Sequence, residues 1–144
     1  MLKTIDVTSH RLYKREKLRS VSAIDALFSH KPGIAGVMAF PVRAVWRLDG
    51  TRAGGTRFLV SVLKKRLRHA VDRVAMRRRI REAYRLHRAI LPDTTTLPLD
   101  IAFIFVSDTL QPYRRIEDAV KKILSRISDS ILKTTDADDA PSAD

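Results

Sequence analysis

The chain has 144 residues, 44% of them hydrophobic and none of them cysteine, so the sequence predicts one domain with a buried core and excludes disulfides and thiolate metal sites. Twenty-eight Lys and Arg residues against 16 Asp and Glu give a net charge of +12, which favours a polyanionic partner. No apolar run approaches the about 18 residues of a membrane span or resembles a signal peptide, so we expect a cytoplasmic protein with no membrane partner.

The N-terminal part of the chain begins with a polar, basic stretch. We predict that residues 1–18 form a flexible segment, because few of their side chains can join a core. Ser20 or Ser22 can then cap a short helix, since a serine hydroxyl accepts hydrogen bonds from the first backbone N–H groups. This helix is expected to run to about Phe28, with one apolar face.

Two strands are predicted next. Residues 37–48 have strand character, and Pro41 among them indicates an edge or a bulge because proline cannot donate to a sheet. The glycine-containing stretch 49–55 predicts a hairpin connection to a second strand at residues 57–63. That second strand is mostly apolar, which is typical of a central strand.

The second half alternates between helix and strand. A basic helix is predicted to start at Asp72 as its N-cap and to end before Pro92. Residues 99–106 are continuously apolar and predict a buried strand. A last helix is expected from Pro112 to about Ser128.

The element order is therefore α-β-β-α-β-α, an α/β (α+β) two-layer sandwich in which helices cover a small mixed sheet. The strand–helix–strand succession implies a parallel pair of strands joined by a crossover. We predict an α/β domain at residues 19–130 and an acidic, disordered tail at residues 131–144, because the tail is rich in Asp and poor in apolar residues.

The predicted basic helix and the loop before it contain the most informative pattern. Lys and Arg occupy eleven of the 25 residues at 64–88, opposed only by Asp72 and Glu82. Helical spacing places a stripe of arginines beside an apolar stripe that can face a core. The apolar stripe consists of Met76, Ile80, Ala83, Tyr84, His87 and Leu91. Glu82 is expected to pair with Arg78 or Arg85.

Such a charge density favours a phosphate backbone as the partner, because binding releases condensed counterions. The alternative is a solvated helix face, although such faces usually mix both signs of charge. We expect the RNA-binding residues to be Lys64, Lys65, Arg66, Arg68, Arg73, Arg77, Arg78, Arg81 and Arg85.

No catalytic or metal-binding residues are predicted. The four histidines lack helical ligand spacing and acidic neighbours, and Asp72 and Glu82 are too far apart to act as an acid–base pair. Some aromatic side chains, such as Phe28 and Phe40, either belong to the core or stack on unpaired bases, with Arg43 beside them for phosphate contacts. Phe58 is more typical of the core.

Several motifs resemble the protein subunit of bacterial ribonuclease P. These are SVLKK at 61–65, AVDR at 70–73 and RRRIREAYR at 77–85, which are similar to the family's strand end and to the Arg-Asn-Arg signature of its central helix. Residues 23–28 resemble its first helix and residues 40–43 its first strand. The resemblance covers about residues 12–128.

The resemblance implies a left-handed β-α-β crossover, as in the second domain of ribosomal protein S5, although right-handed crossovers are the rule. It implies two RNA partners, the catalytic ribonuclease P RNA and precursor tRNA, whose 5′ leader is removed by that RNA with Mg²⁺. On this basis the central helix binds the catalytic RNA, and Phe28, Phe40 and Arg43 contact the leader.

Three positions depart from the family pattern. Val74 and Ala75 stand where the family has Asn and its second Arg, and Ile24 replaces the first aromatic residue of the first helix. These changes put contacts at the start of the basic helix in question and predict weaker stacking on the leader.

Other functions compatible with the basic helix are a structural ribosomal or ribosome-assembly protein, a membrane-surface protein and a DNA-binding protein. The apolar stripe is needed for the core, which disfavours the membrane surface. The absence of two closely spaced helices disfavours DNA as a partner.

Overall fold

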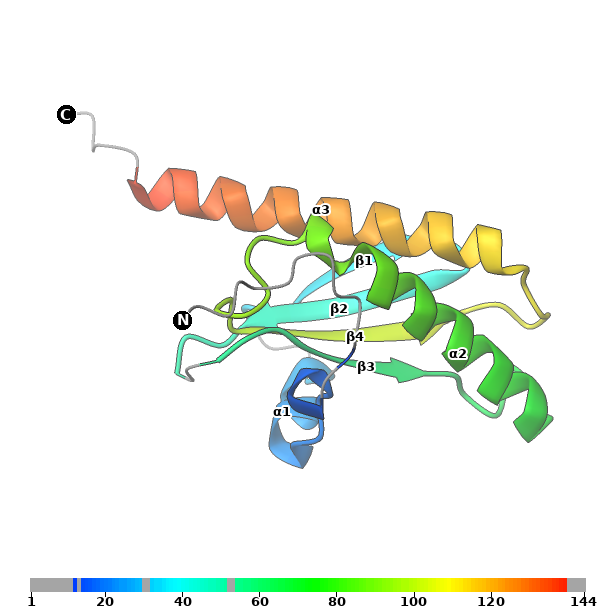
Figure 1. The fold of residues 1–144 in the computed structure, drawn as a ribbon. Coiled ribbons are helices and arrows are strands. Elements are labelled where there is room, and N and C mark those ends of the chain that lie inside the picture. Colours follow the sequence, from blue (N-terminus) through cyan, green and yellow to red (C-terminus); the bar gives the residue numbers. More distant parts are fainter. Residues whose placement is uncertain (1–11, 13, 30–31, 52–53, 140–144) are drawn as a thin grey trace, which may run out of the picture.

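The computed structural model describes residues 12, 14–29, 32–51 and 54–139, with the backbone alone for residues 134–139. Its centre is a four-stranded sheet in the order β1-β2-β4-β3 (Figure 1). The strands are β1 (Ala35–Ala39), β2 (Val42–Leu48), β3 (Arg57–Ser61) and β4 (Leu99–Phe105). The helices are α1 (Val21–Leu27), α2 (Ala70–His87) and α3 (Tyr113–Asp139), with short 3-10 turns η1 (Lys14–Glu16) and η2 (Arg88–Ile90).

The prediction of a single strand at residues 37–48 is wrong, because the chain reverses within this range and forms two strands. β1 and β2 pair antiparallel, from Ala35 opposite Trp46 to Ala39 opposite Val42, and the reversal lies at the cis peptide bond Phe40–Pro41. Apolar, strand-forming residues stand on both sides of Pro41, so the sequence of a hairpin this tight resembles that of one long strand.

The hairpin predicted between the first and second strands is also wrong. β4 lies between β2 and β3, antiparallel to β2 and parallel to β3. β3 is consequently an edge strand and not the central strand that its apolar sequence predicted. Its outer edge is covered in part by the N-terminal segment, where the backbone N–H of Leu18 donates to the Phe58 carbonyl at 2.8 Å. This cover explains why an edge strand has so few polar residues.

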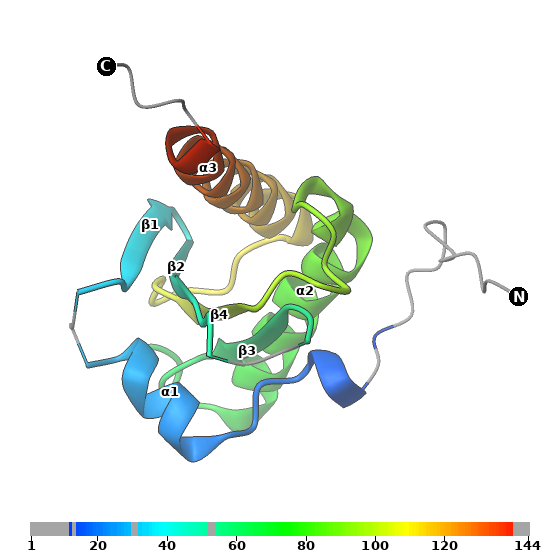
Figure 2. The same ribbon diagram turned by 90° about the vertical axis from the view of Figure 1, so that its left-hand side faces the viewer.

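The connection from β3 through α2 to β4 joins two parallel neighbours, as predicted. In Figure 2 the view runs along the sheet, β3 and β4 recede from the viewer, and the path from β3 through α2 to β4 turns counterclockwise. The crossover is therefore left-handed, as the family resemblance implied and against the usual rule.

The helices lie on both faces of the sheet. α2 and α3 cover one face, and α1 crosses the other (Figures 1 and 2). The larger core lies under α2 and α3, where Phe58, Tyr84 and Phe103 pack together and the Phe58 and Tyr84 rings stack at 4.3 Å between centroids. Phe58 is thus a core residue, as predicted. The sheet and α2 are rigidly joined through this aromatic cluster.

α3 is longer than predicted. Its apolar stripe does not stop at Ser128 but continues to Ile131, which is 5% exposed, and the helical backbone extends to Asp139. Residues 131–139, which we had assigned to the disordered tail, therefore have a helical backbone, because the helix propagates beyond its last core contact. Residues 140–144 and most of the predicted flexible segment 1–18 lie outside the described residues, and the domain boundaries stay predictions.

Candidate nucleic-acid interface

The buried stripe of α2 holds the basic helix against the sheet. Met76, Ile80, Ala83 and Tyr84 are all fully buried, as the helical spacing predicted. His87, predicted on the same stripe, is half-buried, and its Nε2 lies 2.9 Å from a carboxylate oxygen of Glu117 on α3. These contacts fix which way the opposite face of α2 points.

The start of α2 differs from the prediction. The helix begins at Ala70, and its N-cap residue is His69, whose side chain makes no capping hydrogen bond. Asp72 is thus not the N-cap but lies in the first helical turn, where its carboxylate still interacts favourably with the helix dipole. The prediction failed because Asp72, a residue type that caps helices well, was taken as the N-cap, although the observed N-cap is His69, three residues earlier.

Six cationic side chains on and before α2 make no hydrogen bond or ion pair with any other residue that the structure describes. They form what we call the α2 cationic face, which consists of Lys64, Lys65, Arg68, Arg77, Arg78 and Arg81. All are exposed except Arg77, which is half-buried. Their charges are not neutralised by neighbouring carboxylates, so the face is free to attract phosphates.

Other predicted RNA-binding residues have partners within the protein. Arg66 pairs with Asp108 at 3.2 Å, and Arg73 donates to the carbonyl oxygens of Leu67 and Arg68, each at 2.9 Å. These contacts order the loop before α2, which carries Lys64 and Lys65. Arg66 and Arg73 therefore have a structural role in addition to any contact with RNA.

Near the other end of α2, Arg85 is bound by Glu82, with 2.9 Å between Nε and Oε2. This confirms one of the two partners expected for Glu82. Arg88 pairs with Glu16 at 2.7 Å and so ties the N-terminal segment to the end of the helix. Arg79 donates to the Gln111 carbonyl before α3. Ion pairs thus orient the C-terminal end of the helix, and of the arginines in its middle only Arg79 is held by another part of the described chain.

The predicted leader residues lie around α1 and the β1–β2 hairpin. Phe28 is the C-cap residue of α1 and is 43% exposed, and Phe40 at the hairpin turn is 57% exposed. Both are thus available for stacking. Arg43 is exposed on β2, on the face that α1 crosses, and its register partner Ile104 is half-buried on the same face. The structure therefore brings Phe28 and Arg43 to one side of the sheet.

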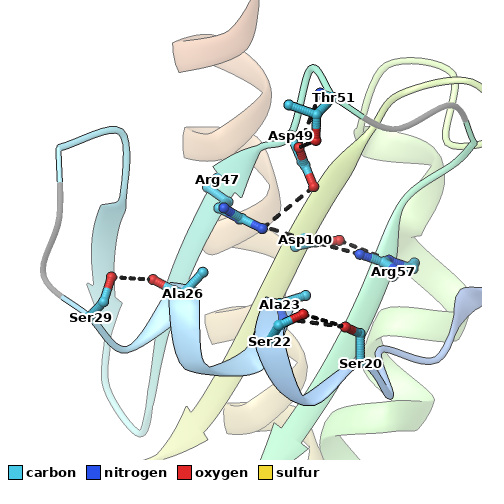
Figure 3. A network of polar contacts seen from close by, with 10 residues as sticks. All are labelled: Ser20, Ser22, Ala23, Ala26, Ser29, Arg47, Asp49, Thr51, Arg57 and Asp100. Carbon is cyan, nitrogen blue, oxygen red and sulfur yellow. Dashed lines mark hydrogen bonds and ion pairs between the residues drawn. The ribbon is translucent and has the colours of Figure 1, made fainter.

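An ion network on this same face was not predicted. Asp100 on β4 is fully buried, and its carboxylate accepts two hydrogen bonds from Arg57 on β3, at 3.0 and 3.1 Å (Figure 3). Arg47 on β2 lies 3.9 Å from the same carboxylate and 3.5 Å from Asp49. The network links three strands beside the N-terminal end of α1. The only signal in the sequence was one carboxylate within an apolar strand.

The described residues contain no group of three or more His, Cys, Asp or Glu side chains placed to hold a metal ion. None of the helices in the described part of the chain is long and apolar enough to cross a membrane.

Comparison with known proteins gives consistent results at the levels of sequence and fold. The family model described as Ribonuclease P matches residues 12–128. Two relatives from strains of Porphyromonas gingivalis, each a ribonuclease P protein component, are 38% and 37% identical over 127 residues, which cover 85% of this chain and 86% of each relative.

Solved structures show the same fold. The RNase P protein of Staphylococcus aureus has a TM-score of 0.64 at 19% identity, with 79% of this chain and 96% of that chain covered. The RNase P protein of Thermotoga maritima has a TM-score of 0.63 at 19% identity, with 78% of this chain and 97% of that chain covered.

Proposed function

Because the chain belongs to the ribonuclease P protein family, whose role is the maturation of tRNA 5′ ends, we propose that its α2 cationic face binds the catalytic RNA of ribonuclease P. The 5′ leader of precursor tRNA then lies on the side of the sheet that α1 crosses. The protein acts in the cytoplasm together with these two RNAs.

The observation that carries the proposal is the set of unpaired cations in the middle of α2. Arg77, Arg78 and Arg81 make no ion pair with the described residues, while the buried stripe fixes the helix on the sheet. Because the backbone of α2 is already fixed, binding of a phosphate has to order only the arginine side chains and not the chain that carries them. A folded RNA with closely spaced phosphates fits such a surface better than a flexible polyanion does.

The arginines of this face bind and orient RNA. A guanidinium carries only N–H donors and no acceptor, so Arg77, Arg78 and Arg81 donate hydrogen bonds to phosphate oxygens. We assign hydrolysis of the phosphodiester to the RNA and to Mg²⁺, which supplies Lewis-acid chemistry and an activated water when bound. The metal is held mainly by the RNA, and the protein contributes binding and position.

The leader contacts rest on exposed aromatic rings next to cations. Phe28 offers a ring for base stacking and Arg43 a guanidinium for phosphate, both on the α1 side. Phe40 offers a second ring at the hairpin turn. Ile24 on α1, which replaces the family's aromatic residue, is partly buried against the core on this side of the sheet and offers no ring for stacking.

At the start of α2, Val74 and Ala75 differ from the family pattern, and a basic side chain nearby partly compensates for the lost RNA contacts. Val74 is 39% exposed and Ala75 packs partly against the core, so neither offers a hydrogen bond to RNA. Of the basic side chains that stand near them, those of Arg66 and Arg79 have partners within the protein, whereas the Arg68 side chain has none among the described residues. Arg68 is therefore the side chain we propose to compensate.

Reconstitution tests the proposal. The protein is mixed with the catalytic RNA of its own organism at low Mg²⁺, and removal of the 5′ leader from precursor tRNA is measured against the RNA alone. We expect clear stimulation, and weaker stimulation from a variant with Arg77→Ala and Arg81→Ala. A variant with Lys121→Ala and Lys122→Ala, two exposed cations on α3, serves as the charge-matched control. No stimulation by the unaltered protein would refute the proposal.

A further inference from the structure

A cavity of about 420 Å³ opens beside α2, between this helix, the start of α3 and the N-terminal segment. Four arginines of α2 line it, namely Arg78, Arg79, Arg81 and Arg85. Glu82, Leu12 and Tyr113 complete its walls. Residues 78, 81, 82 and 85 lie on one side of the helix, so the cavity continues the α2 cationic face toward α3.

Interactions within the protein hold the walls in place. Arg79 donates to the Gln111 carbonyl, which joins α2 to the segment before α3. Arg85 is bound by Glu82. The Tyr113 hydroxyl donates to Glu117 at 3.4 Å, and Glu117 in turn contacts His87. The cavity is thus formed before any ligand binds, as small-molecule sites usually are.

The charge of the lining selects an anion, and its surface selects a flat apolar group. Four arginines and one carboxylate line the cavity, so its surroundings carry a net positive charge, while most of the lining surface itself is apolar. The Tyr113 ring, the Leu12 side chain and the aliphatic stems of the arginines supply the apolar surface. Burial and the neighbouring Glu117 raise the pKa of Tyr113 to about 12, so the phenol stays neutral and adds no negative charge. A nucleotide combines both features in one ligand.

We propose that this cavity binds one unpaired nucleotide that protrudes from the RNA held by α2. Its base lies against Tyr113 and Leu12, and its phosphate contacts Arg78 or Arg81. The inference rests on the proposed function, because those two arginines also belong to the α2 cationic face. The cavity has a volume typical of small-ligand sites, and only a base outside the helical stack can enter it.

The test compares two RNA hairpins of equal stem length, one with a single-nucleotide bulge of 2-aminopurine and one without the bulge. We expect the protein to bind the bulged hairpin about 10-fold more tightly, in line with the usual free energy of base–aromatic stacking. Binding should also change the fluorescence of the 2-aminopurine in the bulge. Tyr113→Ala should abolish this preference and leave binding of the unbulged hairpin unchanged. Tyr113→Phe keeps the ring and should retain the preference.

The matched control is Leu110→Ala, which removes a side chain that is 49% exposed in the loop before α3 but does not line the cavity. It should behave as the unaltered protein does. Equal binding of both hairpins, with normal salt dependence, would overturn the cavity proposal and leave the proposed function standing. If both hairpins bind without any dependence on salt, or if neither hairpin binds, the proposed function would be overturned as well.

Discussion

Removal of two arginines from the middle of α2 should weaken binding of the catalytic RNA in a way that salt reveals. Arg77 and Arg81 lie one helical turn apart and make no ion pair with the described residues, so Arg77→Ala with Arg81→Ala breaks no hydrogen bond or ion pair within the described chain. Alanine also favours helix, and the buried side of α2 is untouched. The fold should therefore persist, with an unchanged thermal unfolding midpoint.

The magnitude follows from counterion release. Each phosphate contact with a helical nucleic acid contributes roughly 0.9 to the slope of log K against log salt. Loss of two contacts should thus flatten the slope by about 1.8. At 0.1 M monovalent salt this corresponds to a roughly 60-fold weaker association constant, or about 2.4 kcal/mol.

The assay is a titration of catalytic RNA with protein at several salt concentrations, at constant Mg²⁺. The control variant, with Lys121→Ala and Lys122→Ala, loses the same net charge from α3, a helix outside the α2 cationic face. It should change the slope by much less. An unchanged slope for the α2 variant, or equal changes for both variants, would refute the assignment of these arginines to phosphate contacts.

Phe28→Ala should weaken binding of precursor tRNA with a leader by about 1–3 kcal/mol, with no effect on mature tRNA, because a stacking ring is lost; equal losses for both RNAs in a binding assay would contradict this. Asp100→Asn should destabilise the fold by about 3 kcal/mol in urea unfolding, because Arg57 loses its buried counter-charge; a loss below about 1 kcal/mol would count against a structural role for the network. The hydrogen bond with His87 lowers the pKa of Glu117 below its usual value of 4.5. The ionised Glu117 side chain therefore stabilises the fold above pH 4.5, and this stabilisation is lost as the pH falls through the lowered pKa. Glu117→Gln should therefore cost under about 1 kcal/mol at pH 7 and reduce the acid-side loss of stability, and an unaltered pH profile of unfolding would contradict the assignment.

The sequence predicted those parts of the fold that depend on local periodicity. The buried stripe of α2 was read correctly from its helical spacing, and Phe58 was correctly placed in the core. The parallel strands around α2 followed from element order. The left-handed crossover came only from the family resemblance, since local sequence physics favours the opposite hand.

The predictions failed where distant segments decide the outcome. Pro41 was interpreted as an edge or a bulge because strand-forming residues on both sides of it do not show that the chain reverses there. β3 was placed at the centre because nothing local indicated that the N-terminal segment would cover its edge at Leu18. The partner of Asp100 lies 43 residues away in sequence, so neither the network nor its geometry was accessible without the fold.

The candidate site was predicted as a set of charges but not as a division of roles. The prediction assigned nine of the basic residues at 64–88 to RNA without separating those that have partners within the protein from those that have none. The structure separates those with partners, such as Arg66 and Arg73, from those without, such as Arg78. Their partners are a carboxylate or backbone oxygens from other parts of the chain, which no helical wheel identifies.

The central claim is that the α2 cationic face contacts the catalytic RNA, and site-directed photo-crosslinking tests it most directly. A photoreactive group is placed at position 78 on α2, and in a second sample at position 122 on α3, within the reconstituted ribonucleoprotein. The account predicts efficient crosslinks to the catalytic RNA from position 78 and few from position 122. Crosslinks of equal efficiency from both positions, or from position 122 alone, would contradict it.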